Sequence, residues 1–362
     1  MCSLGGVFAL LLVHRNLGGV RGAVFLVEPQ SGGWAGQFAS WCFEASRKCS
    51  MSHLLGPALI LIFAASQALR DVYFAHLFQG LDFRFVILFA FGLTIVVCGV
   101  LATLRRPKDF KRMRSQMTTI VWMNLTTALA WTSYFFSLKY VQPSIVNTLH
   151  SGMGPLVLAL LSALRLDIAR PQRPAPAEIA CFCGIAASLA WLIVVGATGT
   201  SGLTSADSVG ATLALVSPLV SGVSITISLL LARRLNEHAI GVDGVSTVRY
   251  IAIVVLTLAW LGLQPDVAPA TTMSWRDWFM LAVSAGLLVS LPLYVMQMGT
   301  ERVRPLTAHV LRALGPAFVF ALELFDGRIA YSGVVLIGIA FYSFFAIASN
   351  LVGLWARRRE EM

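Results

Sequence analysis

The residues best suited to chemistry in this sequence are ionisable side chains that lie inside long apolar stretches. His150, His309 and Arg312 each stand a few residues before a Gly-Pro pair. Ionisable groups are expensive in hydrocarbon, so they are expected to face a cavity or a partner. We expect Arg312 to contact an anionic or zwitterionic solute or to pair with another charge. Each histidine either lines the same cavity or is satisfied as a neutral ring by neighbouring hydroxyl groups.

Proline kinks are expected near the middle of two apolar stretches, at Gly154-Pro155 and Gly315-Pro316. A proline has no N–H and collides with the carbonyl four residues earlier, which frees the carbonyls of Ser151 and Arg312. Exposed backbone acceptors at mid-membrane are typical of a transporter substrate site. A kink that serves only packing fits the same pattern, because proline is common in membrane helices. The matching positions of the two pairs favour a role in substrate binding.

Polar and aromatic side chains recur at helical spacing over 117–138 and therefore share one helix face. The members of this stripe are Asn124, Thr127, Trp131 and Tyr134. Such a face suits a polar organic ligand, and the same groups also hold neighbouring membrane helices together. The further residues that we expect to line the cavity are Asn147, Ser151, Tyr294 and Gln297. The candidates for carrying a coupled proton are Asp71, His309 and Glu323.

Other kinds of chemistry lack the residues that they need. The sequence has no HExxH or GxSxG motif, no two acids at a catalytic spacing and no nucleotide-binding GxxxxGK[ST]. Its six cysteines show no CxxC spacing and no histidine cluster nearby, so we expect neither a metal nor a cofactor. These observations argue against an enzyme.

The elements that must position these residues are membrane-spanning helices. Hydrophobic residues make up 57% of the 362 and charged residues 12%, with a mean hydropathy of +0.77. An average soluble domain is roughly 25% charged, and a helix needs about 20 apolar residues to cross a bilayer. No alternating strand pattern is visible, so the predicted fold class is an all-α membrane protein. The ten predicted spans are 54–74, 84–104, 117–138, 144–165, 177–196, 208–232, 247–263, 277–298, 305–325 and 331–355.

Basic residues gather in alternate connections between the spans, which predicts the orientation of the chain. The even-numbered connections and the C-terminal tail carry most of them, including six between Arg105 and Arg114. Because positive residues in short loops stay in the cytoplasm, both termini are predicted to be cytoplasmic. The net charge of +10 then reflects membrane insertion rather than nucleic-acid binding. The preference for arginine over lysine favours a bacterial inner membrane.

The two halves of the chain match at offsets between 161 residues, from Pro57 to Pro218, and 165 residues, from Arg84 to Arg249. The Gly-Pro pairs match as well. Because each half has five spans, the second enters the membrane from the opposite side, an inverted-repeat plan common among secondary transporters. Arg84 and Arg249 then lie at opposite faces of the membrane, as gate or helix-end residues or as interfacial anchors.

The domain organisation that follows is an N-terminal extension, two repeats and a basic tail, at 1–52, 53–200, 201–356 and 357–362. The extension is rich in Gly, Trp and Ser. It is either disordered, a short interfacial segment, or the product of an over-called start codon, because Met51 directly precedes the first span.

Three segments give the chain a family resemblance. An Arg-aromatic pair opens the second helix of each repeat, "SLKYVQPSIVNTLHSGMGPLV" stands at 137–157 and "ALGPAFVFALELFDGRIA" at 313–330. In these segments the chain resembles the drug/metabolite transporter superfamily, whose EamA-type members have ten spans in two five-helix repeats. The resemblance covers about residues 54–355 and implies transport without naming a substrate.

The function expected from these observations is secondary transport of a small organic metabolite or drug, as an exporter or exchanger. Two inverted repeats would alternate access to a central site. The expected partners are the solute and the lipid bilayer, and a homodimer is compatible with the sequence. A non-transporting multispan receptor or structural membrane protein is the alternative.

Overall fold

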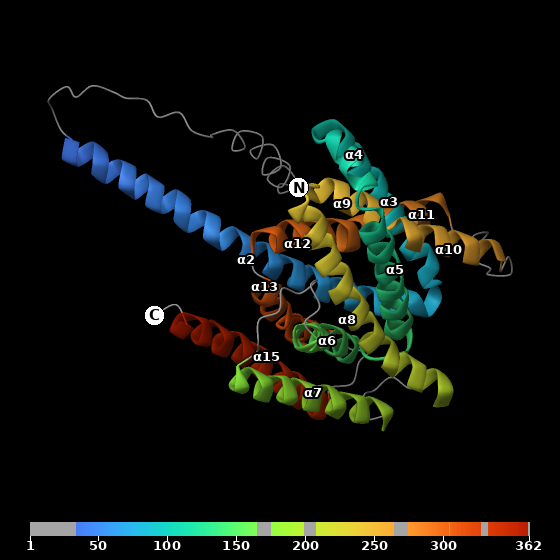
Figure 1. Ribbon diagram of the computed structural model, residues 1–362. Coiled ribbons are helices and arrows are strands. Elements are labelled where there is room, and N and C mark those ends of the chain that lie inside the picture. The colour runs from blue at the N-terminus through green and yellow to red at the C-terminus, as the bar shows by residue number, and fades with distance from the viewer. Residues whose placement is uncertain are drawn as a thin grey trace. The chain divides into compact units, whose positions relative to one another are not determined.

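The computed structural model describes residues 34–164, 175–198, 208–263, 274–303, 305–326 and 332–360. The chain divides into two compact units, Met1–Met51 and Ser52–Met362, and the account below concerns the second. Its described residues form helices and contain no strand (Figure 1). The all-α membrane class predicted from composition is therefore confirmed at this level.

Apolar runs bounded by Gly, Pro and charged residues become helices whose ends fall close to the expected positions. The first group of helices is α2 (Trp34–Gly80), α3 (Phe83–Arg105), α4 (Lys108–Arg114), α5 (Met117–Tyr140), α6 (Pro143–Ala163), α7 (Pro176–Ala197) and α8 (Ser208–Glu237). The second group is α9 (Val242–Arg249), α10 (Ile251–Leu263), α11 (Trp275–Ala285), the π-helical turn η3 (Gly286–Ser290), α12 (Leu291–Arg302), α13 (Pro305–Arg312), α14 (Gly315–Glu323) and α15 (Gly333–Glu360).

Eight helical segments of the described chain are long and apolar enough to cross a membrane. They are Leu55–Phe78, Phe83–Arg105, Pro143–Ala163, Pro176–Ala197, Gly210–Glu237, Val242–Leu263, Trp275–Arg302 and Gly333–Gly353. Each coincides with a predicted span, although the segment Val242–Leu263 begins earlier than the predicted span 247–263. A multi-pass membrane protein follows from these lengths and compositions.

The other two of the ten predicted spans form helices that are either too short or too polar to count among these eight segments. The third, in α5, has sufficient length, but its Asn, Thr, Ser and Lys residues make it more polar than the others. The ninth is divided, because α13 ends at Arg312 and α14 begins at Gly315. Neither part of the ninth span is by itself long enough to cross a bilayer.

The two Gly-Pro pairs affect their helices differently. Pro155 lies inside the continuous helix α6. Pro316 instead occupies the first turn of α14, immediately after the break at Ala313 and Leu314, where a missing N–H costs no hydrogen bond. The predicted symmetry of the two kinks is therefore present in the sequence positions and not in the local helix geometry.

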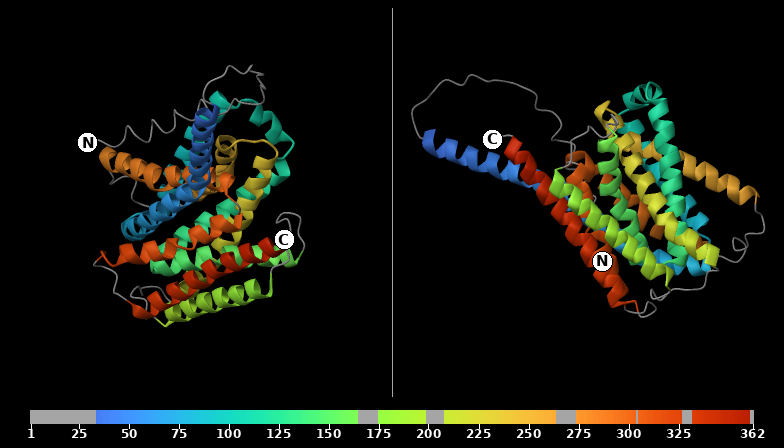
Figure 2. Two further views of the ribbon diagram at one scale, coloured as in Figure 1. Left: turned by 90° about the vertical axis from the view of Figure 1, so that its left-hand side faces the viewer. Right: turned by 60° about the horizontal axis from the view of Figure 1, so that its bottom comes forward.

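The helices pack as close pairs around an aromatic core. α5 packs along α8, α6 packs against α7, α8 and α14, and α7 and α15 run side by side (Figures 1 and 2). In the core, the Phe78 and Phe135 rings lie 5.4 Å apart and the Phe91 and Tyr250 rings 4.8 Å apart. The stripe predicted in α5 thus faces other helices, and its polar groups form hydrogen bonds with α2, α6, α8, α9 and α10.

Candidate functional site

The polar interior contains an arginine and an aspartate that are adjacent in α2. Arg70 and Asp71 are 1% and 0% exposed. Asp71 Oδ1 accepts hydrogen bonds from Arg70 Nε at 2.8 Å and Nη2 at 2.5 Å. The Arg70 guanidinium also lies 5.0 Å from the centre of the Trp131 ring. Each charge therefore has its counter-ion inside the bundle, as a buried charge requires.

Two residues predicted to line the site bind the second carboxylate oxygen of Asp71. The Tyr134 hydroxyl donates to Oδ2 at 2.5 Å and Asn147 Nδ2 donates at 2.7 Å. Tyr134 comes from α5 and Asn147 from α6, so one carboxylate joins three helices. Sequence reasoning missed Arg70, although a charged residue inside a predicted span was a usable signal.

A second buried arginine, Arg312, lies at the end of α13 and contacts His150 of α6. Its Nη2 is 3.5 Å from His150 Nε2, and its guanidinium lies 5.8 Å from the Phe63 ring centre. The His150 ring is in turn 4.7 Å from the Tyr134 ring. The predicted residues His150, Tyr134 and Arg312 therefore belong to one connected cluster that also contains Asp71.

The hydrogen bonds around His150 indicate which ring nitrogen carries the proton. Ser221 Oγ donates its single proton to the Ala130 carbonyl at 2.6 Å, so it can only accept from His150 Nδ1 at 3.0 Å. A neutral ring protonated at Nδ1 leaves Nε2 as an acceptor, the role that suits the Arg312 guanidinium. The histidine thus fixes the orientation of the arginine without neutralising its charge.

A third buried arginine, Arg249, lies at the end of α9 and is 2% exposed. Its Nε donates to Thr127 Oγ1 at 3.3 Å, and its Nη1 donates to Gln297 Oε1 at 3.3 Å. Both partners are neutral. Arg249 is thus placed in the interior, as the eighth residue of the candidate span Val242–Leu263, beside Thr127 and Gln297.

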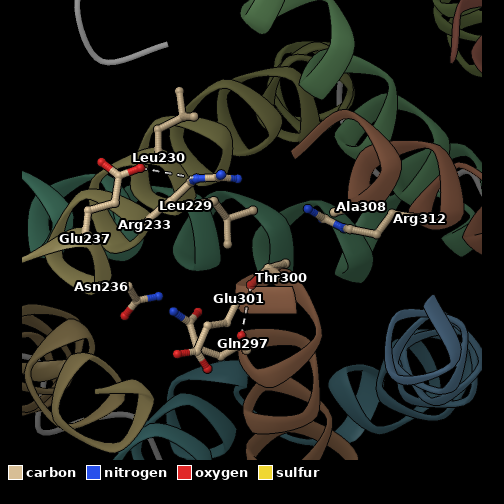
Figure 3. Close-up of a pocket in the computed structure, with 10 residues that line it drawn as sticks. All are labelled: Leu229, Leu230, Arg233, Asn236, Glu237, Gln297, Thr300, Glu301, Ala308 and Arg312. Carbon is tan, nitrogen blue, oxygen red and sulfur yellow. Dashed lines mark hydrogen bonds and ion pairs between the residues drawn. The ribbon is translucent and has the colours of Figure 1, made fainter. Parts of the chain in front are cut away.

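A cavity of about 240 Å³ adjoins this cluster. Its lining residues are Leu229, Leu230, Arg233, Asn236, Glu237, Gln297, Thr300, Glu301, Ala308 and Arg312. The Arg312 side chain reaches toward the cavity from α13, and Gln297 and Thr300 reach it from α12 (Figure 3). The exposed side chains Arg233, Glu237 and Glu301 mark its mouth. Of the predicted site residues whose side chains the structure describes, Arg312 and Gln297 line the cavity directly.

Glu323, a buried carboxylate of α14, does not line the cavity and binds the start of α6. Its Oε1 accepts from the Ser144 backbone N–H at 2.8 Å, and its Oε2 accepts from Gln142 Nε2 at 2.9 Å. Both partners belong to the first turn of α6, whose free N–H groups and positive dipole end favour a negative charge. At 1.5 Å per residue, Ser144 lies about 9 Å along α6 from His150.

Two other predicted residues have structural partners elsewhere. Asn124 accepts from the Ala252 N–H at 2.9 Å and donates to the Val248 carbonyl at 2.7 Å, which satisfies the backbone at the break between α9 and α10. The Tyr294 hydroxyl donates to Asp243 Oδ1 at 2.7 Å, and Tyr294 is not among the residues that line the cavity.

Arg84 forms an ion pair at the start of α3. Its Nη2 lies 2.6 Å from Asp82 Oδ2, and Asp82 also caps the helix by accepting from the Arg84 backbone N–H at 2.9 Å. Burial raises the pKa of Asp82, but the hydrogen bonds and charge of Arg84 outweigh it and hold the pKa below its usual value. The guanidinium also lies 4.8 Å from the Trp260 ring centre. Arg84 thus lies apart from the residues that line the cavity.

The remaining predicted residues lie near the cluster or outside the part of the chain that the structure describes. Ser151 Oγ is 3.5 Å from Asn147 Oδ1. A Cβ at Gly315 would lie 3.2 Å from Asn147 Oδ1, which places the break before α14 beside the cluster. The His309 side chain lies outside the described part of the structure. Among the described residues, no group of three His, Cys, Asp or Glu side chains is placed to hold a metal ion.

Comparison with known proteins shows a likeness of fold. No protein-family model and no curated protein sequence matches the chain. A solved structure, described only as a crystal structure of a protein, matches with a TM-score of 0.57 over 86% of this chain and 99% of that chain. The two sequences are 17% identical, so the match concerns the fold alone.

Proposed function

We propose that this protein is a secondary transporter that moves a small organic metabolite across a membrane by alternating access. The observation that carries the proposal is a cavity lined by a buried guanidinium in the interior of an apolar helical bundle. Ionisable groups placed in this way are typical of substrate pathways. Their burial costs free energy, and helix packing alone does not require them.

The topology that we propose has ten spans in two inverted five-helix repeats. The eight candidate spans, together with α5 and the pair α13 and α14, supply these ten segments in order. Both termini would be cytoplasmic in a bacterial inner membrane, and the resemblance to EamA-type drug/metabolite transporters supports the same plan. In this topology the cavity mouth, which lies between the sixth and eighth connections, faces the cytoplasm.

The contact between Glu323 and the start of α6 would act as the gate on the opposite side. In the proposed topology, α6 begins and α14 ends at the external face. The two hydrogen bonds of Glu323 hold these ends together while the cytoplasmic mouth is accessible. Exchange between this arrangement and its inverse would carry a solute past Arg312.

The test is solute counterflow in liposomes that contain the purified full-length chain. A carrier preloaded with unlabelled solute concentrates the labelled solute without an energy source, whereas a receptor or structural protein does not. We expect at least one member of a panel of radiolabelled organic acids, amino acids and sugars to accumulate with the wild type. Arg312→Gln should abolish that accumulation while the protein still folds and inserts.

The matched control is Arg234→Gln, which makes the same change at an exposed arginine of α8 that does not line the cavity. It should retain counterflow. Equal accumulation in wild-type and Arg312→Gln liposomes would contradict the proposed role of the cavity. The absence of counterflow for every solute of the panel would contradict transport itself.

A further inference from the structure

The buried arginines and carboxylates of the described residues are not all paired with one another. Three arginines, Arg70, Arg249 and Arg312, are at most 5% exposed, and of these only Arg70 has a carboxylate partner in the described residues. The buried carboxylate of Glu323 is bound to the first turn of α6 instead. In the described residues, the guanidinium groups of Arg249 and Arg312 thus contact neutral side chains, while the carboxylates that line the cavity, Glu237 and Glu301, are exposed at its mouth.

The unpaired buried groups of the described residues include four N–H donors on arginine and tryptophan side chains. Within the described residues, the buried side-chain nitrogen atoms without a hydrogen-bond partner are Arg70 Nη1, Trp131 Nε1, Arg249 Nη2 and Arg312 Nε. The unpaired buried oxygen atoms are Gln142 Oε1, Ser144 Oγ, Asn236 Oδ1, Tyr342 Oη and Asn350 Oδ1, and of these residues only Asn236 lines the cavity. A buried donor without an acceptor is costly, and a buried charge without a counter-ion costs more. Such an interior is complementary to a ligand that brings negative charge and acceptor oxygens.

We propose that the solute is a small organic carboxylate, bound in this cavity by the guanidinium of Arg312. The planar guanidinium presents paired N–H groups that match the two oxygens of a carboxylate, and His150 holds it in place. This inference rests on the proposed function, since it names the chemical class of what is carried.

The uncharged part of the lining fits the body of such a solute, and the charged side chains Arg233, Glu237 and Glu301 lie at the mouth. Leu229, Leu230 and Ala308 offer apolar surface, while Gln297 and Thr300 offer polar groups. Gln297 accepts from Arg249, so the second unpaired charge lies directly behind the lining and reinforces the positive potential. The volume of about 240 Å³ is below the roughly 300–1,000 Å³ of drug-sized sites, which favours a metabolite over a drug.

The binding test uses the full-length chain in detergent micelles at constant ionic strength. The probes are sodium propionate, lactate and pyruvate, and each carboxylate is compared with its uncharged amide. Methylphosphonate serves as a phosphorus-based anion of similar size. We expect a saturable rise in the unfolding temperature with a carboxylate and none with the amides or methylphosphonate.

Substitutions then locate the site. Because a hydrogen bond to a charged group is worth more than a neutral one, Arg312→Gln should weaken carboxylate binding by about 10- to 100-fold. Arg312→Lys retains the charge but loses the planar pair of N–H groups, so it should weaken carboxylate binding less than Arg312→Gln does. Arg249→Gln should weaken binding without abolishing it, and Arg234→Gln should leave it unchanged. Circular dichroism and size-exclusion profiles establish that each variant is folded.

Several results would overturn the inference. They are equal stabilisation by amides, stabilisation by methylphosphonate alone, and unchanged carboxylate binding in a folded Arg312→Gln protein. Counterflow of a sugar or an amine without any carboxylate binding would refute the carboxylate site and leave transport standing. Carboxylate binding without counterflow would support the site and count against transport.

Discussion

Individual side chains show how the polar interior is held together. Asp71 accepts hydrogen bonds from Arg70, Tyr134 and Asn147, which come from three different helices. All three donors share this one carboxylate, and its removal leaves all three short of an acceptor. The pair of Arg70 and Asp71 is therefore expected to be a structural requirement, whereas Arg312, which has no carboxylate partner in the described residues, is the residue proposed to bind the solute.

We predict that Asp71→Asn lowers the free energy of unfolding by about 3–5 kcal/mol, the cost of leaving a buried guanidinium uncompensated. Thermal unfolding of the purified protein in micelles measures the loss. Arg70→Met combined with Asp71→Asn should recover much of it, because the double variant buries no unpaired charge.

The matched control is Asp82→Asn, which breaks the other Arg-Asp pair of the first helices. The Asp82 side chain is 21% exposed, compared with 0% for Asp71, so water replaces part of the lost interaction. Its destabilisation should be clearly smaller. Equal losses of unfolding free energy for the two variants would show that the buried pair of Arg70 and Asp71 contributes no more than a partly exposed one.

At the level of the helices, close backbone approach decides where the site residues meet. α8 crosses α6 at Gly222, where a Cβ would collide with the carbonyl oxygen of His150. The same two helices supply Ser221 and His150, whose hydrogen bond orients the ring beside Arg312. The glycine therefore sets the distance on which the cluster depends.

Gly222→Ala should separate α6 from α8 and destabilise the protein by about 1–3 kcal/mol, the usual cost of overpacking. It should also weaken carboxylate binding, because His150 moves away from Ser221. The control is Gly92→Ala in α3, where a Cβ would meet no atom within 4 Å. Unfolding temperatures and binding titrations of both variants would decide the matter, and equal behaviour would refute the role of Gly222.

For the whole molecule, the relevant features are a cavity mouth and a closed end. Under the proposed topology, Thr300 lines the cytoplasmic mouth and Glu323 closes the external side. The two arrangements of an alternating-access transporter differ by a few kcal/mol, so the loss of one charged contact shifts their populations measurably. Glu323 therefore influences how often Thr300 is accessible.

In a chain without its native cysteines, Thr300→Cys should react with a membrane-impermeant maleimide added from the cytoplasmic side. Adding Glu323→Gln weakens the external closure and should lower the rate of that reaction severalfold. Ser115→Cys, an exposed position on the same predicted side, is the control and should react equally in both backgrounds. An unchanged rate at Thr300→Cys would show that Glu323 does not gate the cavity.

The sequence by itself determined the all-α membrane class and the positions of most helices. Apolar runs of about 20 residues have one low-energy state in a bilayer, because each backbone polar group must be satisfied within its own helix. The sequence also identified Arg312, His150, Tyr134 and Asn147 as unusual, since the cost of polar groups in hydrocarbon depends on residue type and depth.

Only the tertiary structure decided which of these residues meet. Sequence spacing placed Asn124 on the same face as Tyr134, yet Asn124 satisfies a helix break while Tyr134 binds Asp71. Tyr294 is likewise occupied by Asp243. Such partnerships join residues far apart in the chain, 162 positions for His150 and Arg312 and 181 for Gln142 and Glu323. They depend on how closely the helices approach and rotate, which hydrophobic periodicity leaves free.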